Sequence, residues 1–108
     1  MIKIGTRISP DWLERSEDLK FLKQIGVDCV DITLDMCIGF AEAGGRANRD
    51  GLERIAEALD RAGLKVERAN ALNRFMVAIY LDRPGAEQEL DNLVHNVELC
   101  GAFGFPVV

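Results

Sequence analysis

The segment "CVDITLDM" at residues 29–36 alternates apolar side chains with acidic and hydroxyl side chains. This period of two predicts a β-strand over residues 27–34 with one apolar face. The other face would carry Asp31 and Thr33, and Asp35 would follow at the end of the strand. Because an unpaired buried carboxylate is costly, the acidic face needs surroundings that pair or solvate its carboxylates.

Strands and helices alternate along the chain on both sides of this segment. Four strands are predicted, at residues 2–8, 27–34, 64–69 and 105–108. Three helices are predicted: one over residues 16–25, one that begins at the N-cap Asn48, and one that begins at Pro84. A glycine follows the end of each helix, as expected of a left-handed helix cap: Gly26, Gly63 and Gly104. Such alternation predicts a parallel sheet with right-handed crossover connections.

The predicted loops differ in length between the two edges of this sheet. The helix-to-strand connections are a few residues long, whereas the strand-to-helix connections 35–47 and 70–83 are unusually long. The long loops therefore follow the carboxyl ends of the strands, the edge where parallel α/β enzymes place their active sites.

The polar face of strand 27–34 bears on the choice between an open sheet and a barrel. An open doubly wound sheet has helices on both faces, and both faces should then be apolar. In a (β/α)8 barrel one face is the interior, where Arg7, Asp31, Glu67 and Arg68 could neutralise each other. The GxGxxG pattern of dinucleotide-binding folds is also absent after the first strand. We therefore expect a barrel.

The predicted fold class is α/β, a partial (β/α)8 TIM barrel formed by residues 1–108 as a single domain. The chain supplies about three βα units plus the start of a fourth parallel strand, whereas a complete barrel needs about 250 residues. We interpret it as the N-terminal half of a truncated barrel. The structural alternative is an autonomous half-barrel that pairs with itself through its exposed sheet edges, which makes a homo-oligomer possible.

Charge and cysteine content limit the possible partners and compartments. A net charge of −5 without a Lys/Arg cluster argues against nucleic acid. The stretch "MIKIGTRISPD" does not have the pattern of a signal peptide, and no apolar run approaches the length of a membrane span, so we expect neither. The three cysteines lack CxxC spacing, which predicts reduced thiols in a cytoplasmic protein, with a reactive loop thiol at Cys37 as the alternative.

Five residues are candidates for a small-molecule site: Arg7, Asp35, Asn70, Asn73 and Arg74. Asp35 could act as a catalytic acid or base, or could cap its loop. The two asparagines and Arg74 suit recognition of a polyol, although asparagine is also an ordinary turn residue.

Two further arginines have open alternatives. Arg7 could bind a substrate carboxylate or phosphate, or could form an interior ion pair with Asp31 or Glu67. Arg46 follows Gly44 and Gly45 in a loop that precedes a helix N-terminus. That loop could hold an anion, or it could be mobile with a solvated arginine.

Several of these segments are similar to a known family. "IKIGTRI", "LKQIGVDCVDITLD" and "ALDRAGLKVERANAL" resemble the xylose-isomerase-like TIM-barrel superfamily of sugar isomerases and epimerases. Within it, "GGRANRDGLERI" and "VERANALNR" resemble the branch of mannonate dehydratases. The resemblance implies the N-terminal portion of a divalent-metal-dependent isomerase, epimerase or dehydratase (a lyase) that acts on a sugar or sugar acid at the mouth of the barrel.

The resemblance also bears on the metal and on activity. It implies Mn or Mg held by ligands outside this chain, so no metal ligand is expected within it. His95, the only histidine, falls in the middle of a predicted helix, which argues against a metal role. The chain alone should then be inactive. The alternative function is a non-catalytic, self-associating half-barrel that binds or scaffolds a partner.

Overall fold

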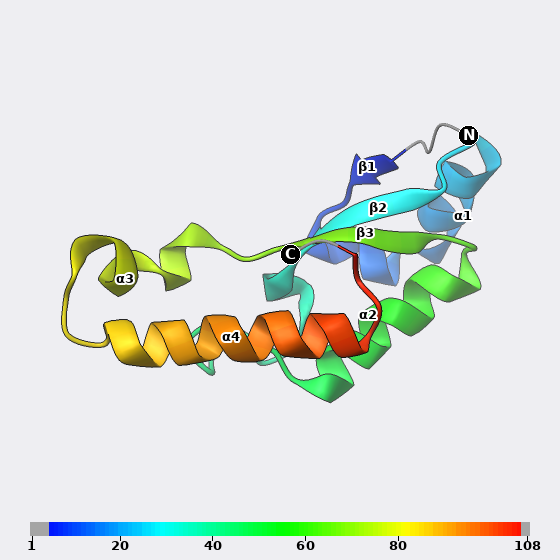
Figure 1. Cartoon of the computed structure of the whole chain (residues 1–108). Helices are drawn as coiled ribbons and strands as arrows, with labels where there is room; N and C mark the ends of the chain where they lie inside the picture. Colours follow the sequence, from blue (N-terminus) through cyan, green and yellow to red (C-terminus); the bar gives the residue numbers. More distant parts are fainter. Residues whose placement is uncertain (1–4, 107–108) are drawn as a thin grey trace.

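The structure is a computed structural model that describes residues 5–106, apart from the side chain of Asn73. Its strands are β1 (Gly5–Arg7), β2 (Cys29–Thr33) and β3 (Lys65–Asn70). They form a parallel sheet in the order β1-β2-β3 (Figure 1). The described α-helices are α1 (Ser16–Gln24), α2 (Arg49–Arg61), α3 (Val77–Leu81) and α4 (Ala86–Ala102). Short 3-10 turns lie at η1 (Pro10–Glu14), η2 (Leu34–Met36) and η3 (Asn73–Phe75).

The apolar face of the sheet and the inner faces of α1 and α2 form the core. Val30 and Ile32 of β2 are fully buried, and so are Leu52 and Ile55 of α2. Asn48 caps α2 as predicted, since its Oδ1 accepts a hydrogen bond of 2.7 Å from the Gly51 amide. Helical spacing in the sequence also predicts an apolar stripe on this helix, and the burial of Leu52, Ile55 and Leu59 confirms it.

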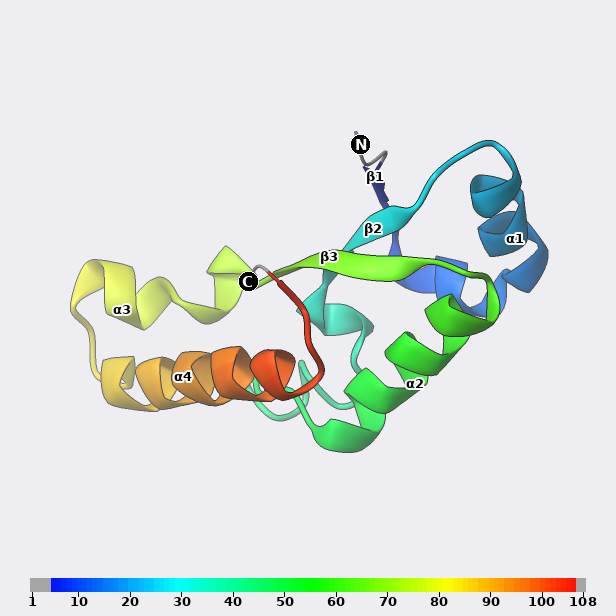
Figure 2. The same ribbon diagram turned by 45° about the vertical axis from the view of Figure 1, so that its right-hand side comes forward.

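The opposite face of the sheet carries no helix of the described chain (Figures 1 and 2). Arg7 and Arg68 are exposed on it, and Asp31, which is in register with both, is half-buried. The polar face of β2 is thus solvated at one side of an open sheet. The acidic side of β2 is therefore hydrated by solvent and is not enclosed in a barrel interior, which avoids the cost of burying unpaired carboxylates.

Helices α3 and α4 lie beyond the carboxyl ends of the strands (Figure 2). The predicted loop 70–83 contains η3 and the whole of α3, so it is not an unstructured connection. α4 begins at Ala86 after an N-cap at Gly85, two residues later than Pro84. It packs against α3 and against the loop 44–47, and it runs from its far end back toward the sheet (Figure 1).

The prediction of a partial (β/α)8 barrel is wrong. The described chain is a small α/β domain with a three-stranded parallel sheet and four α-helices. Phe105 and Pro106 are not in a strand, and residues 107–108 of the predicted fourth strand lie outside the described residues. After α4 the chain turns, because the Phe105 amide donates to the Cys100 carbonyl at 3.1 Å. Self-association of this domain through its exposed sheet edges stays a prediction.

Helical spacing in the sequence predicts one apolar stripe on the last helix, made of Leu90, Leu93, Val94, Val97 and Cys100, but the structure divides these residues between the two sides of α4. Cys100 is buried and Leu93 is half-buried. Leu90, Val94 and Val97 are instead 52%, 49% and 46% exposed. Within residues 5–106, none of the helices combines the length and the hydrophobicity that a membrane span requires.

Candidate functional site

The carboxyl ends of β2 and β3 bring several of the predicted site residues together. Thr33 and Asn70 are register partners at the last positions of the two strands. The chain then enters η2, which contains Asp35, and η3, which contains Arg74. These two short turns are neighbours because parallel strands end at the same edge of a sheet.

Asp35 is the centre of a small polar cluster at this edge. The Thr33 hydroxyl donates a hydrogen bond to Asp35 Oδ1. Arg74 Nη2 lies 3.4 Å from Asp35 Oδ2, and the Arg74 guanidinium stacks 4.9 Å from the centre of the Phe75 ring. Thr33 thus orients one carboxylate oxygen and Arg74 neutralises the other. Sequence reasoning placed Thr33 on the polar face but missed its role as a partner of Asp35, although Thr33 lies only two residues before Asp35 at the end of the strand.

This cluster is accessible to a ligand. The side chain of Asp35 is 24% exposed and that of Arg74 is 60% exposed. An ion pair with so much solvent contact contributes little stability, so a ligand carboxylate could replace Asp35 on the guanidinium at small cost. A planar guanidinium beside a hydroxyl and an amide suits a small molecule with one carboxylate and several hydroxyl groups.

The other three predicted site residues are not part of the contact between Asp35 and Arg74. Asn70 is half-buried at the same edge, beside Thr33. Asn73 begins η3, but its side chain is outside the described part of the structure. Arg7 is exposed on the edge strand β1 and forms no ion pair with any described residue. The interior ion pair between Arg7 and Asp31 is therefore not formed.

The loop 44–47 is anchored to α4 and does not present a free anion site. Asn96 Oδ1 accepts from the Ala47 amide at 2.8 Å, and Asn96 Nδ2 donates to the Gly45 carbonyl at 2.9 Å. Arg46 lies 3.2 Å from Asp91 Oδ2 and 3.2 Å from Asn92 Oδ1. The Ala47 amide and the arginine that could have held an anion already have protein partners.

The thiols and the histidine have structural surroundings. Burial raises the pKa of the Cys37 thiol above its ordinary value, and Cys37 is 1% exposed, so the reactive-thiol alternative is not supported. His95 Nε2 lies 2.8 Å from the Ala47 carbonyl oxygen and belongs to the contact between α4 and its loop. Among the described residues, no group of three or more His, Cys, Asp or Glu side chains could hold a metal ion.

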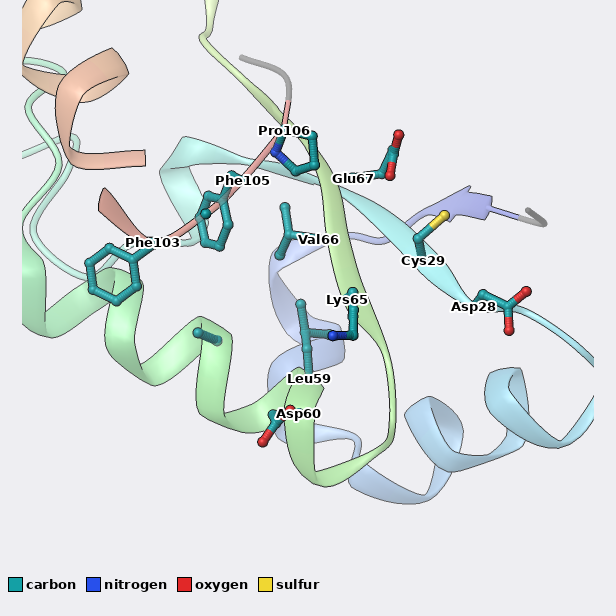
Figure 3. Close-up of a pocket in the computed structure, with 12 residues that line it drawn as sticks. Asp28, Cys29, Leu59, Asp60, Lys65, Val66, Glu67, Phe103, Phe105 and Pro106 are labelled. Atoms are coloured by element: carbon teal, nitrogen blue, oxygen red, sulfur yellow. The ribbon is translucent and has the colours of Figure 1, made fainter. Parts of the chain in front are cut away.

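Apart from this polar cluster, a hollow of about 510 Å³ runs alongside β3, between α2 and the segment after α4 (Figure 3). Leu59, Val66 and Phe105 contribute its apolar walls. Charged residues of both signs line its edges: Asp28, Asp60, Lys65 and Glu67. None of the predicted site residues lines it. We favour the carboxyl edge as the site because the groups there can act on a polar ligand together.

The candidate site therefore consists of Thr33, Asp35, Asn70 and Arg74 at the carboxyl edge of the sheet, with Arg7 one strand away. Comparison of the chain with protein-family models, with curated proteins and with solved structures finds no match, so the resemblance to sugar isomerases and epimerases stays a prediction.

Proposed function

We propose that this chain binds a sugar acid or sugar at the carboxyl edge of its sheet, as the substrate-binding portion of an isomerase, epimerase or dehydratase. The observation that supports the proposal is the contact between Asp35 and Arg74, from adjacent strand-to-helix segments. The proposal does not need a barrel, because three parallel strands already form the edge at which α/β enzymes bind their ligands.

Each residue of the site has a role in this proposal. Arg74 pairs with the ligand carboxylate through two parallel N–H groups. Asn70 and Asn73 provide amide groups for ligand hydroxyls. Asp35, held by the Thr33 hydroxyl, accepts a hydrogen bond from a ligand hydroxyl and is placed to exchange a proton with it. Arg7 extends the positive end of the site along the open face of the sheet.

Two further expectations accompany the proposal. The resemblance implies Mn or Mg held by ligands outside this chain, and this stays a prediction. The cytoplasm stays our prediction for the compartment, supported by three free cysteines.

The test is an NMR titration of the isotope-labelled chain with mannonate, and in parallel with the neutral mannose and mannitol. We expect shifts at Thr33, Asp35, Asn70 and Arg74, and tighter binding of mannonate than of the neutral compounds. Arg74→Ala should weaken mannonate binding about tenfold, which equals about 1.4 kcal/mol, while changing mannose binding little. Arg61→Ala is the control, because it also removes an arginine from an exposed ion pair, that of 3.8 Å with Glu57 on α2, away from the carboxyl edge.

Two results would contradict the proposal. One is the absence of shifts at the carboxyl edge at mannonate concentrations that leave the fold unchanged. The other is a set of shifts confined to the hollow beside Val66 and Phe105, which would move the binding site to the other end of β3.

A further inference from the structure

Helix α4 buries amide side chains and exposes apolar ones. Asn92 and Asn96 are 5% and 3% exposed, and they are the only buried polar or charged residues in the described chain. On the other side of the helix, Leu90, Val94 and Val97 are each about half exposed. Cys100 is buried with the amides, so α4 has apolar residues on both its inner and its outer side, whereas an ordinary surface helix turns its apolar side to the core.

Hydrogen bonds explain why the amides face inward. Asn96 bonds to the backbone of both Gly45 and Ala47. Asn92 Oδ1 accepts from Arg46 at 3.2 Å and from Gln88 at 3.0 Å. No described buried side-chain polar atom lacks a partner. Turning the apolar row inward would break these bonds, so the helix is held with that row toward solvent.

The exposed apolar residues form one continuous row. Their spacings of four and three residues place Leu90, Val94 and Val97 in line along one side of the helix, the pattern of a helix–helix contact. We call this row the α4 stripe. Contiguous exposed apolar surface of this kind marks interaction sites in soluble proteins.

An acidic row lies beside the α4 stripe. An α-helix turns by about 100° per residue. This rotation places three acidic residues one after another along the flank of α4 next to Val94: Glu87, Asp91 and Glu98. Residues 86–102 contain no lysine or arginine. Asp91 is 3.2 Å from Arg46, whereas Glu87 and Glu98 form no ion pair with a described residue. The stripe therefore borders a flank on which two of the three acidic side chains, Glu87 and Glu98, have no cationic partner among the described residues.

We propose that the α4 stripe binds a basic amphipathic helix of a partner protein. Leucine-type side chains of that helix would cover Leu90, Val94 and Val97, and its lysine or arginine residues would face the acidic row. This surface is separate from the proposed sugar site and does not depend on it.

Charge argues against two other occupants. In an antiparallel pair of two α4 helices related by a twofold axis, both acidic rows would lie on the same side of the contact and repel each other. An anionic membrane surface would repel the same row. A cationic helix is the occupant whose charge complements both features.

The test uses a synthetic amphipathic peptide about three heptads long, with leucines at alternating spacings of three and four and lysines along one flank. We expect binding to the full chain by isothermal titration calorimetry, with affinity that falls as salt rises. Val94→Ser should weaken it about tenfold, and Glu98→Lys should weaken it and reduce the salt dependence. Both positions are exposed, so far-UV circular dichroism should be unchanged.

The controls are one variant and two peptides. Phe21→Ser removes an equally exposed apolar residue (56%) from α1 and should leave binding unchanged. A scrambled peptide and a peptide with glutamate in place of lysine should not bind. Equal binding of either control peptide, or no binding of the lysine peptide, would overturn the proposal. So would a dimer in sedimentation equilibrium that Val94→Ser abolishes, since the occupant would then be a second copy.

Discussion

At the scale of single residues, the buried thiols show how position alters chemistry. Cys100 is fully buried on the inner side of α4. Burial, together with the nearby Cys37 thiol, raises the pKa of Cys100 to about 11. Both thiols are therefore protonated at neutral pH, and a protonated buried thiol is a poor nucleophile.

This burial predicts a pH dependence of stability. In the unfolded chain Cys100 returns to a pKa of about 9, so above that pH the unfolded state loses its proton while the folded state keeps it. The free energy of unfolding should fall as the pH rises from about 9 to about 11. Urea denaturation under reducing conditions over this range would measure the fall.

Cys100→Ala is the variant that isolates this effect. It should be less stable at neutral pH, because it leaves a small cavity, but its stability should fall less steeply in alkali. Other groups also titrate at high pH, and the comparison of the two proteins removes their contribution. Equal slopes in both proteins would contradict the assignment to Cys100.

The contact between Asp35 and Arg74, also at the scale of single residues, could not be predicted from the sequence. Each was a candidate because it follows the carboxyl end of a predicted strand. Their contact joins residues 39 positions apart, and it depends on the pairing of β2 with β3 and on the paths of η2 and η3. Residue type suggested the chemistry of the site, whereas the pairing of the strands decided which residues meet.

At the scale of elements, α2 and α4 differ in what sequence reveals. The cap and the buried stripe of α2 follow from local spacing and both occur. Four-residue spacing also predicts two ion pairs on its outer side: Glu57 pairs with Arg61, whereas Arg54 pairs with Glu14 of η1 and not with Asp50. α4 has an equally clear apolar row, but that row is exposed. Its orientation is decided by Asn92 and Asn96, whose backbone partners lie in the loop 44–47.

Because Asn96 holds α4 to the loop 44–47, it should contribute strongly to stability. Asn96→Ala would leave the Ala47 amide and the Gly45 carbonyl without their partner. The free energy of unfolding should fall by about 2 to 4 kcal/mol, because each buried polar group left unpaired costs about 1 to 3 kcal/mol. Urea denaturation would measure the fall.

Glu98→Ala is the matched control on the exposed side of the same helix, and it should change stability by less than about 0.5 kcal/mol. If the two substitutions had similar effects, α4 would not depend on its amide contacts. Hydrogen exchange at the Ala47 amide gives an independent readout, since this amide should lose protection only in the Asn96 variant.

At the scale of the whole molecule, the domain is longer than an ordinary one of its size. Its extents are 48 × 28 × 21 Å, and its Cα radius of gyration is 14.6 Å. A compact domain of 108 residues would have a radius of about 13 Å. The extra length is the pair α3 and α4, which projects beyond the carboxyl ends of the strands (Figure 1).

Small-angle X-ray scattering should show this elongation. We expect a monomer with a radius of gyration near 14.6 Å, increased slightly by the hydration layer, and an asymmetric distance distribution. A concentration series is the control for self-association. A radius near 13 Å would mean that α3 and α4 fold back on the sheet in solution, and the mass of a dimer would contradict the charge argument for α4.

The sequence by itself determined the local elements: strands from a period of two, helices from spacings of three and four, and helix ends from Asn48 and Gly63. These depend on neighbouring residues, whose geometry is the same in any fold. The tertiary structure alone decided that the sheet is open, that α4 faces its amides inward, and that Asp35 meets Arg74. Those features depend on contacts between distant segments, and the same strands and helices are compatible with several such arrangements.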